Sequence, residues 1–134
     1  MSDFQTQVID DFRAGGGKVG GMFEGMDMLL LHHVGARSGQ QRVAPLAYLK
    51  DGERYAIFAS KAGAPTNPAW YHNLKANPET TIEVGTETVK VTATEPDRAE
   101  RDRIFTAMGE RRPQFAEYQT KTTRVIPVIL LTPA

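Results

Sequence analysis

Short runs in which apolar residues are continuous, or alternate with polar ones, recur along this chain, and both patterns are typical of β-strands. The run at 26–34 is almost continuously apolar, which is the pattern of a strand buried on both faces. Together the runs predict six short strands, at 26–34, at 42–50, within 50–60, as a pair within 80–94, and at 126–132.

Two breaks between these runs predict hairpin turns. Asp51-Gly52 separates the second run from the third, and both residues tolerate a positive φ. Gly85-Thr86 divides 80–94 into two arms of alternating pattern. Neighbouring strands joined by such short turns are antiparallel.

Helical spacing marks the start of the chain. Phe4, Val8 and Phe12 fall four residues apart, so the first dozen residues predict a short amphipathic helix. The glycines of 15–21 follow it and formally match the G-x-G-x-x-G motif. Because a helical pattern, and not a strand, precedes them, we interpret this segment as a flexible connection and not as a dinucleotide-binding loop.

Further helices are predicted between the later strands. Asn67 is placed to cap a short helix at 67–78, with a proline at its first position. Asp97 and Glu100 form the capping-box pattern of a second helix. Pro113 ends that helix and begins a further helical turn.

Six short strands, mostly joined as hairpins, with three or four short helices indicate an α+β fold built on a small antiparallel β-barrel. The length of 134 residues suits one hydrophobic core. We therefore expect a single domain over 1–134, in which 1–22 supplies the N-terminal helix and the glycine-rich segment.

The charge of the chain is balanced overall but unevenly distributed. Sixteen basic residues match sixteen acidic ones, so the chain offers no general attraction to nucleic acid, and we expect no nucleic-acid partner. The segment 37–75, however, holds six basic residues and two acidic ones. This local excess of positive charge fits a site for an anion.

Several classes of protein are disfavoured. The chain has no cysteine, which excludes disulfides and a thiolate nucleophile. His32 and His33 are adjacent on a strand and point to opposite faces, so they cannot jointly ligate a metal, and we expect no metal site. No signal-like segment opens the chain and no apolar run reaches membrane-spanning length, so we expect a cytoplasmic protein.

The sequence GARSGQQRVAPL, residues 35–46, is the first candidate for anion binding. Arg37 and Arg42 offer forked donors, Ser38 offers a hydroxyl, and the two glycines allow the backbone to expose its amides. The same residues also fit a solvated basic turn, and spacing alone does not decide between these two interpretations.

A second glycine-bearing loop follows the third strand. Residues 59–67 combine Ser60, Lys61 and Gly63 with the N-terminus of the next helix, where partial positive charge favours anions. An ordinary loop with a cap would have the same pattern. Two such loops at neighbouring strand ends nevertheless favour an anion site more than either does alone.

Three further side chains could meet a planar ligand. Trp70 and Asn73 lie on one face of the helix at 67–78, and the Tyr118 phenol could donate a hydrogen bond or a proton. Trp70 and Tyr118 also fit packed core positions. No serine has a histidine beside it in the sequence to serve as its base.

The stretch GARSGQQRVAPLAYLKDGERYAIFASKAGAPTNPAWYHNLKANP, residues 35–78, resembles the deazaflavin-dependent nitroreductase family, split-barrel proteins that use the reduced deazaflavin coenzyme F-420. The similarity extends through FRAGGGKVGG before it and FAEYQTKTTRVIPVILL after it, so nearly the whole chain is covered in order. The resemblance implies a split β-barrel like those that bind FMN. It also implies an oxidoreductase that transfers hydride to a quinone, an enone or a nitroaromatic acceptor.

The resemblance implies where the cofactor binds. Its ring would lie over the loop 59–63, beside the following helix, and its phosphate and polyglutamate tail would follow a basic groove. The implied cofactor-binding residues are Arg37, Ser38, Gly39, Arg42, Ala44, Pro45, Leu46, Ala59, Ser60, Lys61, Ala62, Gly63, Pro68, Ala69, Trp70 and Asn73. Ser60 and Tyr118 are the implied catalytic residues, which bind the substrate or supply a proton. This chain has Phe115 where some relatives have a tyrosine, and Ala36 where a basic residue is common.

Two alternatives to this function stay open. One is an FMN-binding split-barrel oxidoreductase, and the other is a non-catalytic protein that binds or carries the deazaflavin. The expected partner is a small-molecule hydride acceptor, and the chain is expected to be a monomer or a homodimer. The apolar face of the first helix would either dock on a membrane that holds lipophilic quinones or pack on its own barrel, and we expect the second.

Overall fold

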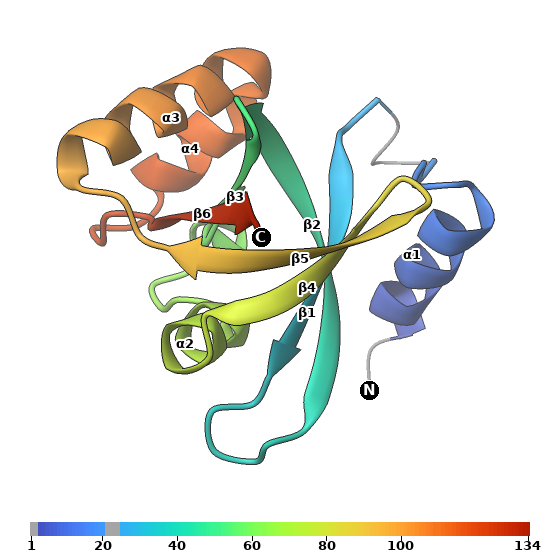
Figure 1. Ribbon diagram of the computed structural model, residues 1–134. Helices are drawn as coiled ribbons and strands as arrows, with labels where there is room; N and C mark the ends of the chain where they lie inside the picture. Colours follow the sequence, from blue (N-terminus) through green and yellow to red (C-terminus); the bar gives the residue numbers. More distant parts are fainter. Residues whose placement is uncertain (1–2, 21–24) are drawn as a thin grey trace.

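The computed structural model describes residues 3–20 and 25–134 (Figure 1). Within them the strands are β1 (Met28–Val34), β2 (Gln41–Asp51), β3 (Arg54–Phe58), β4 (Glu79–Val84), β5 (Glu87–Thr94) and β6 (Val128–Pro133). The helices are α1 (Asp3–Ala14), α2 (Ala69–Ala76), α3 (Arg98–Arg111), α4 (Pro113–Thr120) and the short 3-10 turn η2 (Lys61–Gly63). Every predicted strand and helix is present within a few residues of its expected bounds.

The strands form a closed barrel in the order β1-β2-β3-β6-β5-β4, because β1 pairs with β4 as well as with β2. All neighbouring pairs are antiparallel. The α+β antiparallel barrel is therefore confirmed. Buried apolar side chains fill the interior of the barrel, so the space for a ligand lies outside it, between the barrel and its helices.

Strand β1 is buried on both faces, as its apolar run predicts. Leu29 and Leu31 point into the barrel core, whereas Met28 and Leu30 point outward under α1. All four side chains are buried because the barrel covers one face and a helix covers the other.

Helix α1 packs on the barrel and does not expose its apolar face. Val8 and Phe12 are buried against Met28 and Leu30 of β1, which confirms the expected packing. Figure 1 shows α1 lying along the outside of the barrel. The side chain of Phe4 lies outside the described residues.

Helices α3 and α4 form a second layer beside β3 and β6, where Phe58 packs on Phe115 of α4 and on Phe105 of α3. The predicted cap of α3 is confirmed, because an Asp97 carboxylate oxygen accepts a hydrogen bond from the amide of Glu100 at 2.9 Å. This packing holds α4 over the end of β3.

Two local predictions are wrong by small amounts. Asp51 pairs with Arg54 as the last residue of β2, so the β2–β3 turn is Gly52-Glu53, and only Gly52 has a positive φ (62°). The residue before α2 that occupies the cap position is Pro68, and Asn67 caps nothing. The Asn67 side chain instead accepts a hydrogen bond from Arg124. The Gly85-Thr86 turn is confirmed.

The glycine-rich segment is packed and is not only a connection. The amide of Gly17 donates to the Phe12 carbonyl, and a Cβ added at Gly17 would lie 2.5 Å from the Cα of Gly85. Glycine is therefore required at this close approach of two backbones. Gly21 lies outside the described residues.

No helix within 3–20 and 25–134 has both the length and the apolar character needed to cross a membrane.

Candidate functional site

A central cavity of about 290 Å³ lies on the outer face of β2, between the N-terminal end of α2 and helix α4. Its wall is mostly apolar, and the residues that line it are Met26, Met28, Pro45, Leu46, Ala47, Phe58, Ser60, Lys61, Pro68, Trp70, Gln114, Phe115 and Tyr118. A flat aromatic ligand is the kind of molecule that such a wall accommodates.

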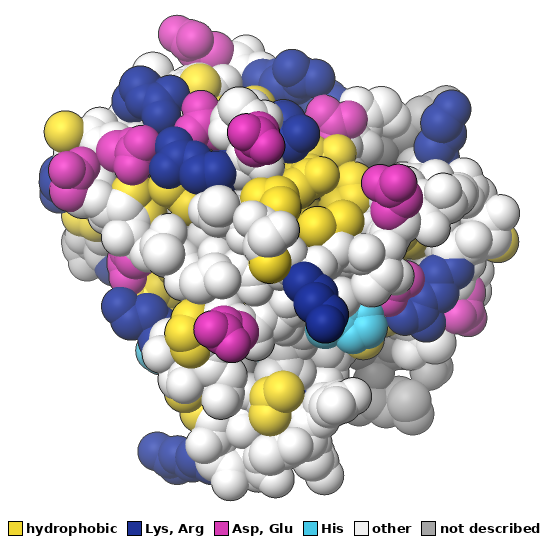
Figure 2. Space-filling view, in the orientation of Figure 1, with side chains coloured by type: hydrophobic (Ala, Val, Ile, Leu, Met, Phe, Trp, Pro, Cys, Tyr) yellow, Lys and Arg dark blue, Asp and Glu magenta, His cyan; other side chains and the backbone are white. Residues whose placement is uncertain are grey.

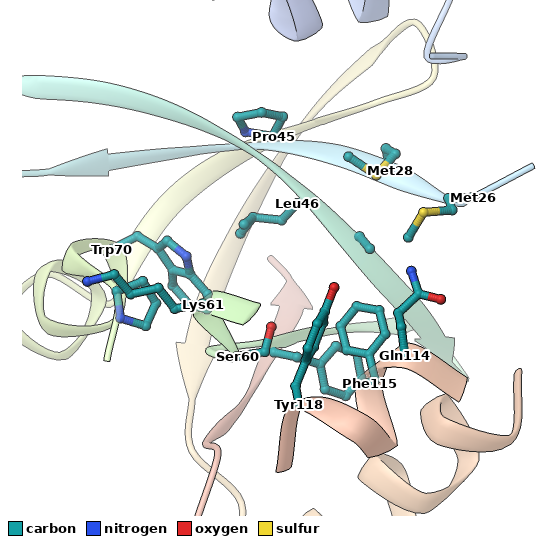
Figure 3. A pocket seen from close by; sticks show the side chains of 13 residues that line it. Met26, Met28, Pro45, Leu46, Ser60, Lys61, Trp70, Gln114, Phe115 and Tyr118 are labelled. Carbon is teal, nitrogen blue, oxygen red and sulfur yellow. The ribbon is translucent and has the colours of Figure 1, made fainter. Parts of the chain in front are cut away.

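Few polar groups enter the central cavity. Figure 3 shows the hydroxyls of Ser60 and Tyr118 directed into it, with Trp70 and Lys61 at one end and the Gln114 amide at the other. Among the described residues, neither hydroxyl has a hydrogen-bond partner. These two groups are therefore free to donate to a bound molecule.

The loop that carries Ser60 has an uncommon backbone. Lys61 has a φ of 46°, the one positive value at a described residue other than glycine. A Cβ added at Gly63 would lie 2.8 Å from the Tyr118 carbonyl oxygen and 2.8 Å from the Lys121 Cβ. Tight packing against the end of α4 thus holds this turn, and strained residues of this kind cluster at ligand sites.

A second depression, which we call the hairpin hollow, lies between the β1–β2 loop and α2 and has a volume of about 690 Å³. It is lined by Gly35, Ala36, Arg37, Ser38, Arg42, Ala69, His72 and Asn73. Pro68 and Trp70 face the central cavity, whereas Ala69 and Asn73 of the same helix face the hairpin hollow. The two sites therefore adjoin each other along α2 and β2.

The β1–β2 loop is held by its own backbone. The amide of Gly35 donates to the Gln40 carbonyl and that of Gly39, at a φ of 72°, donates to the Gly35 carbonyl. The Ser38 hydroxyl accepts from the Gln40 amide at 3.2 Å. Arg37 in this loop and Arg42 at the start of β2 are both exposed.

Asn73 connects α2 to this loop. Its Oδ1 accepts from the Ala36 amide at 2.9 Å, and its Nδ2 lies 2.9 Å from Nδ1 of His33. Asn73 and His33 are both buried. Because Oδ1 is the acceptor for Ala36, Nδ2 donates to His33, whose imidazole is then neutral with its proton on Nε2. Burial, followed by the nearby charge of Arg42, lowers the pKa of His33.

His32 and His33 point to opposite faces, as predicted. His32 Nε2 lies 2.7 Å from a Glu83 carboxylate oxygen, on the side away from Asn73. No group of three or more histidines, aspartates or glutamates within the described part of the chain is placed to hold a metal ion.

Positive charge at the two sites has no internal partner. Arg37, Arg42 and Lys61 are exposed, and none of them lies within 4 Å of a carboxylate among residues 3–20 and 25–134. Their remaining contacts are weak: Arg42 donates to Gln40 Oε1 at 3.5 Å, and Lys61 donates to Thr66 Oγ1 at 3.4 Å.

The structure divides the other expected site residues into two groups. Pro45, Leu46, Pro68 and Trp70 line the central cavity, and Trp70 also belongs to the barrel core. The second group is Ala44, Ala59 and Gly63, which are all buried and have no polar side chain that could bind a ligand. Of these, Ala59 has both backbone groups hydrogen-bonded already, to Pro127 and to Arg124.

The remaining expected residues lie in the loops. Ala69 lines the hairpin hollow. Gly39 lies at the tip of the β1–β2 loop. Ala62 is the central residue of η2, and its side chain lies outside the described residues.

Sequence reasoning missed Gln114 and the two methionines of the central cavity. Gln114 follows the proline that begins α4, and its amide reaches the cavity because α4 packs over the end of β3. Met26 and Met28 belong to the apolar run of the first strand, and nothing in that run separates lining residues from core residues. No local signal identifies these positions.

The profile of the family described as F420H(2)-dependent quinone reductase matches residues 5–133 of the chain. An F420H(2)-dependent quinone reductase of Mycobacterium tuberculosis is 41% identical over 125 residues, which cover 90% of this chain and 84% of the relative.

Several solved structures are similar to this one, two of them at 36% identity or more. A structure described as an F420-H2 dependent reductase has a TM-score of 0.71 and 40% identity, covering 78% of this chain and 93% of the other. A second structure, described as a domain-swapped dimer, has a TM-score of 0.73 and 36% identity, covering 94% of this chain and 92% of the other.

Proposed function

The chain belongs to the F420H(2)-dependent quinone reductase family, and from this premise we propose that it is an oxidoreductase that uses reduced coenzyme F-420 to transfer hydride to a quinone. The observation that carries the proposal in the structure is the junction of an apolar cavity, large enough for a ring, with a hollow that holds unpaired cations.

The residues present fit this cofactor. Trp70, Pro45 and Leu46 supply apolar surface for a flat ring in the central cavity. Arg37 and Arg42 would hold the anionic tail, because guanidinium groups match phosphate and carboxylate oxygens and here have no carboxylate of the described chain to pair with. When bound, the reduced coenzyme supplies the hydride, so the chain needs neither a metal nor a nucleophile of its own.

The chain itself would orient the acceptor and supply a proton. A quinone that gains a hydride also needs a proton on oxygen, and the Tyr118 and Ser60 hydroxyls are the free donors that face the cavity. Phe115 stacks edge-on against Tyr118, with ring centroids 5.4 Å apart, and thereby limits the rotation of the phenol. The apolar wall excludes water from the reacting atoms.

Reduction of enones and nitroaromatic compounds is a broader part of the same proposal. Such acceptors share the need for hydride followed by a proton, so the same two hydroxyls would serve them. We infer that the working form is a monomer or a homodimer. One of the similar structures is described as a domain-swapped dimer, so formation of a homodimer is worth testing.

The test is a titration of the purified protein with coenzyme F-420 and with FMN, followed by addition of a quinone to the complex with the reduced coenzyme. The proposal predicts tighter binding of F-420 and loss of the reduced-coenzyme spectrum on addition of the quinone. Tighter binding of FMN would favour an FMN enzyme, and binding without oxidation by any quinone, enone or nitro compound would favour a carrier.

Replacement of the two hydroxyls identifies the proton donor. Because a positioned acid contributes on the order of a hundredfold or more to rate, either Tyr118→Phe or Ser60→Ala should lower kcat by about that factor, with little change in the affinity for F-420. Unchanged kcat in both variants would place the proton donor elsewhere.

A further inference from the structure

Arg124 lies in the segment between α4 and β6 and points back under the Ser60 loop. Its own backbone is fixed from behind, because the side-chain amide of Gln119 donates to the Arg124 carbonyl at 2.7 Å. The Gln119 side-chain oxygen accepts from the Ile126 amide at 3.0 Å and from Arg101 at 2.8 Å. The guanidinium thus projects from a rigid base.

The guanidinium donates to four acceptors of one loop. Nε donates to the Ala64 carbonyl at 2.9 Å, and Nη2 donates to the Ser60 carbonyl at 2.8 Å. Nη1 donates to the Ala59 carbonyl at 3.0 Å and to Oδ1 of Asn67 at 2.7 Å. A planar fork is required to reach acceptors on both sides of η2, and a lysine ammonium could not span them.

All four acceptors are neutral. Among residues 3–20 and 25–134, no carboxylate lies within 4 Å of Arg124, whereas Arg54, also partly buried, contacts both Asp51 and Glu100. Burial lowers the pKa of Arg124, with no acidic neighbour to oppose that shift. An arginine still keeps its proton at neutral pH, so its positive charge stays uncompensated beside the central cavity.

The loop that Arg124 holds has a shape that needs support. Lys61 is in the left-handed region, which is unfavourable for a residue with a side chain. Gly63 packs on the end of α4 at one side, and Arg124 binds the carbonyls at the other. Without one of these supports, the turn would relax and Ser60 would leave its position.

We propose that Arg124 is the positioning residue of this site: its fork holds the loop so that Ser60 and Lys61 face the central cavity, and its unpaired charge adds to the attraction for an anionic ligand. The inference deepens the proposed function, and it rests on that function for the identity of the ligand. Its positioning role is independent of which ligand binds.

Two variants at the Arg124–Asn67 contact separate the effect of the loop's shape from the effect of the Arg124 charge. Asn67→Asp places a carboxylate 2.7 Å from Nη1 with almost no change in size, so the loop should stay held while the charge is neutralised. Arg124→Gln removes both the fork and the charge. Arg54→Gln, which removes a partly buried arginine at the start of β3, the end of that strand away from the Ser60 loop, is the matched control.

Hydrogen exchange of the cofactor-free proteins measures the loop directly. The amides of Gly63 and Ala64, which donate to the carbonyls of Ser60 and Lys61, should exchange at least tenfold faster in Arg124→Gln, and at wild-type rates in Asn67→Asp and in the Arg54→Gln control. Arg124→Lys, which keeps the charge and loses the fork, should show the fast exchange. Wild-type protection in a folded Arg124→Gln or Arg124→Lys protein would overturn the positioning role.

The affinity for coenzyme F-420 tests whether the charge of Arg124 contributes to ligand binding. Asn67→Asp should raise the Kd severalfold and reduce its dependence on salt, although its loop is protected. Arg124→Gln should raise the Kd more than tenfold, and the control should not change it. An unchanged Kd and salt dependence in Asn67→Asp would overturn the charge role.

The two proposals fail differently. If the wild-type protein does not bind F-420, the proposed function is wrong, yet the exchange rates still decide whether Arg124 positions the loop. If wild-type binding is tight and Arg124→Gln binds equally well, this inference is wrong and the proposed function stands. If Arg124→Gln does not fold, Arg124→Lys and Asn67→Ala, which removes one acceptor, give the same comparison by exchange.

Discussion

Two hairpins with arginines lie at opposite ends of β2 (Figure 1). The arginines of one are paired with carboxylates, and within the part of the chain that the structure describes those of the other are not. At the β2–β3 end, Arg54 lies 2.6 Å from Asp51 and 3.0 Å from Glu100, and Arg103 lies 3.3 Å from Asp51. At the β1–β2 end, the arginines have no carboxylate within 4 Å among the described residues. On the face shown in Figure 2, basic and acidic side chains mix over α3, and no acidic side chain lies over the β1–β2 hairpin.

The difference separates an arginine cluster that is paired within the fold from one that is free to bind a ligand, as the proposed function requires. Both ends form depressions lined by two arginines and a glycine turn. Only the β1–β2 end leaves its donors unused, so only that end can attract an anion from outside. The net charge of zero does not reveal this arrangement. The numbers of acidic and basic residues are equal, but the acidic residues of the described chain lie away from the unpaired arginines.

The largest expected effect comes from removal of Arg37 and Arg42, the unpaired arginines at the β1–β2 end, which we call the open arginines. Each charge-assisted contact contributes about 1.5 kcal/mol or more, so Arg37→Ala combined with Arg42→Ala should raise the Kd for coenzyme F-420 on the order of a hundredfold. Fluorescence titration at one salt concentration measures it. The matched double variant at the other end, Arg54→Ala with Arg103→Ala, should bind as the wild type does. Equal losses in the two double variants would remove the distinction between the ends.

A smaller effect on cofactor affinity should follow when an arginine of the β1–β2 end, the open end, is given a carboxylate partner. Arginines at the β2–β3 end, the paired end, already have such partners. Gln40 Oε1 lies 3.5 Å from an Arg42 nitrogen, so Gln40→Glu would give that arginine an internal counter-ion with almost no change in size. We expect a severalfold rise in the Kd for F-420 and a flatter dependence on salt, both measurable by calorimetry. A Kd at the wild-type value would show that Arg42 does not contact the ligand.

At the paired end, Arg103→Ala should affect stability alone. An exposed ion pair is screened by solvent and contributes little, so the free energy of unfolding should fall only slightly in a urea titration. Activity and cofactor affinity should be unchanged. A loss of affinity would mean that the paired end also contributes to the site.

The smallest effect is a difference in pH response. The folded state lowers the pKa of His33 from 6.5, so protonation is disfavoured there, and the stability that its neutral form provides is lost as pH falls below 6.5. Hydrogen bonds from Arg103 and Arg54 lower the pKa of Asp51 from 3.8, so its contribution persists until pH falls below that value.

Acidification from pH 7 to pH 5 should therefore loosen the β1–β2 loop and leave the β2–β3 turn unchanged. A protonated His33 can no longer accept from Asn73, whose amide also holds the Ala36 backbone. Hydrogen exchange of residues 35–40 and 51–54, corrected for the intrinsic effect of pH, measures the difference. Equal responses of the two turns would contradict it, and His33→Gln should abolish it.

The sequence predicts most of this fold because its signals are local. The apolar run of β1, the Gly85-Thr86 turn and the Asp97 cap each depend on neighbouring residues, and each is confirmed. The exceptions are tertiary. Asn67 has the sequence of a cap, but a guanidinium 57 residues further along the chain takes its side chain.

The site is predictable only in part for the same reason. The basic loops can be found from composition, because six cations and two acids within 37–75 mark an imbalance. Whether each arginine is paired depends on residues far away: Glu100 reaches Arg54 across 46 positions. Gln114 and Arg124 enter the site through the packing of α4 and of the segment after it, and no motif marks them.

The dependence of F-420 binding on salt tests the central claim most directly, because it counts the charges that the ligand engages. The wild-type protein should lose affinity steeply between low and high salt, and the Arg37→Ala, Arg42→Ala protein should show a much flatter dependence that meets the wild-type curve at high salt. Parallel curves for the two proteins would contradict the claim that the open arginines hold the anionic tail.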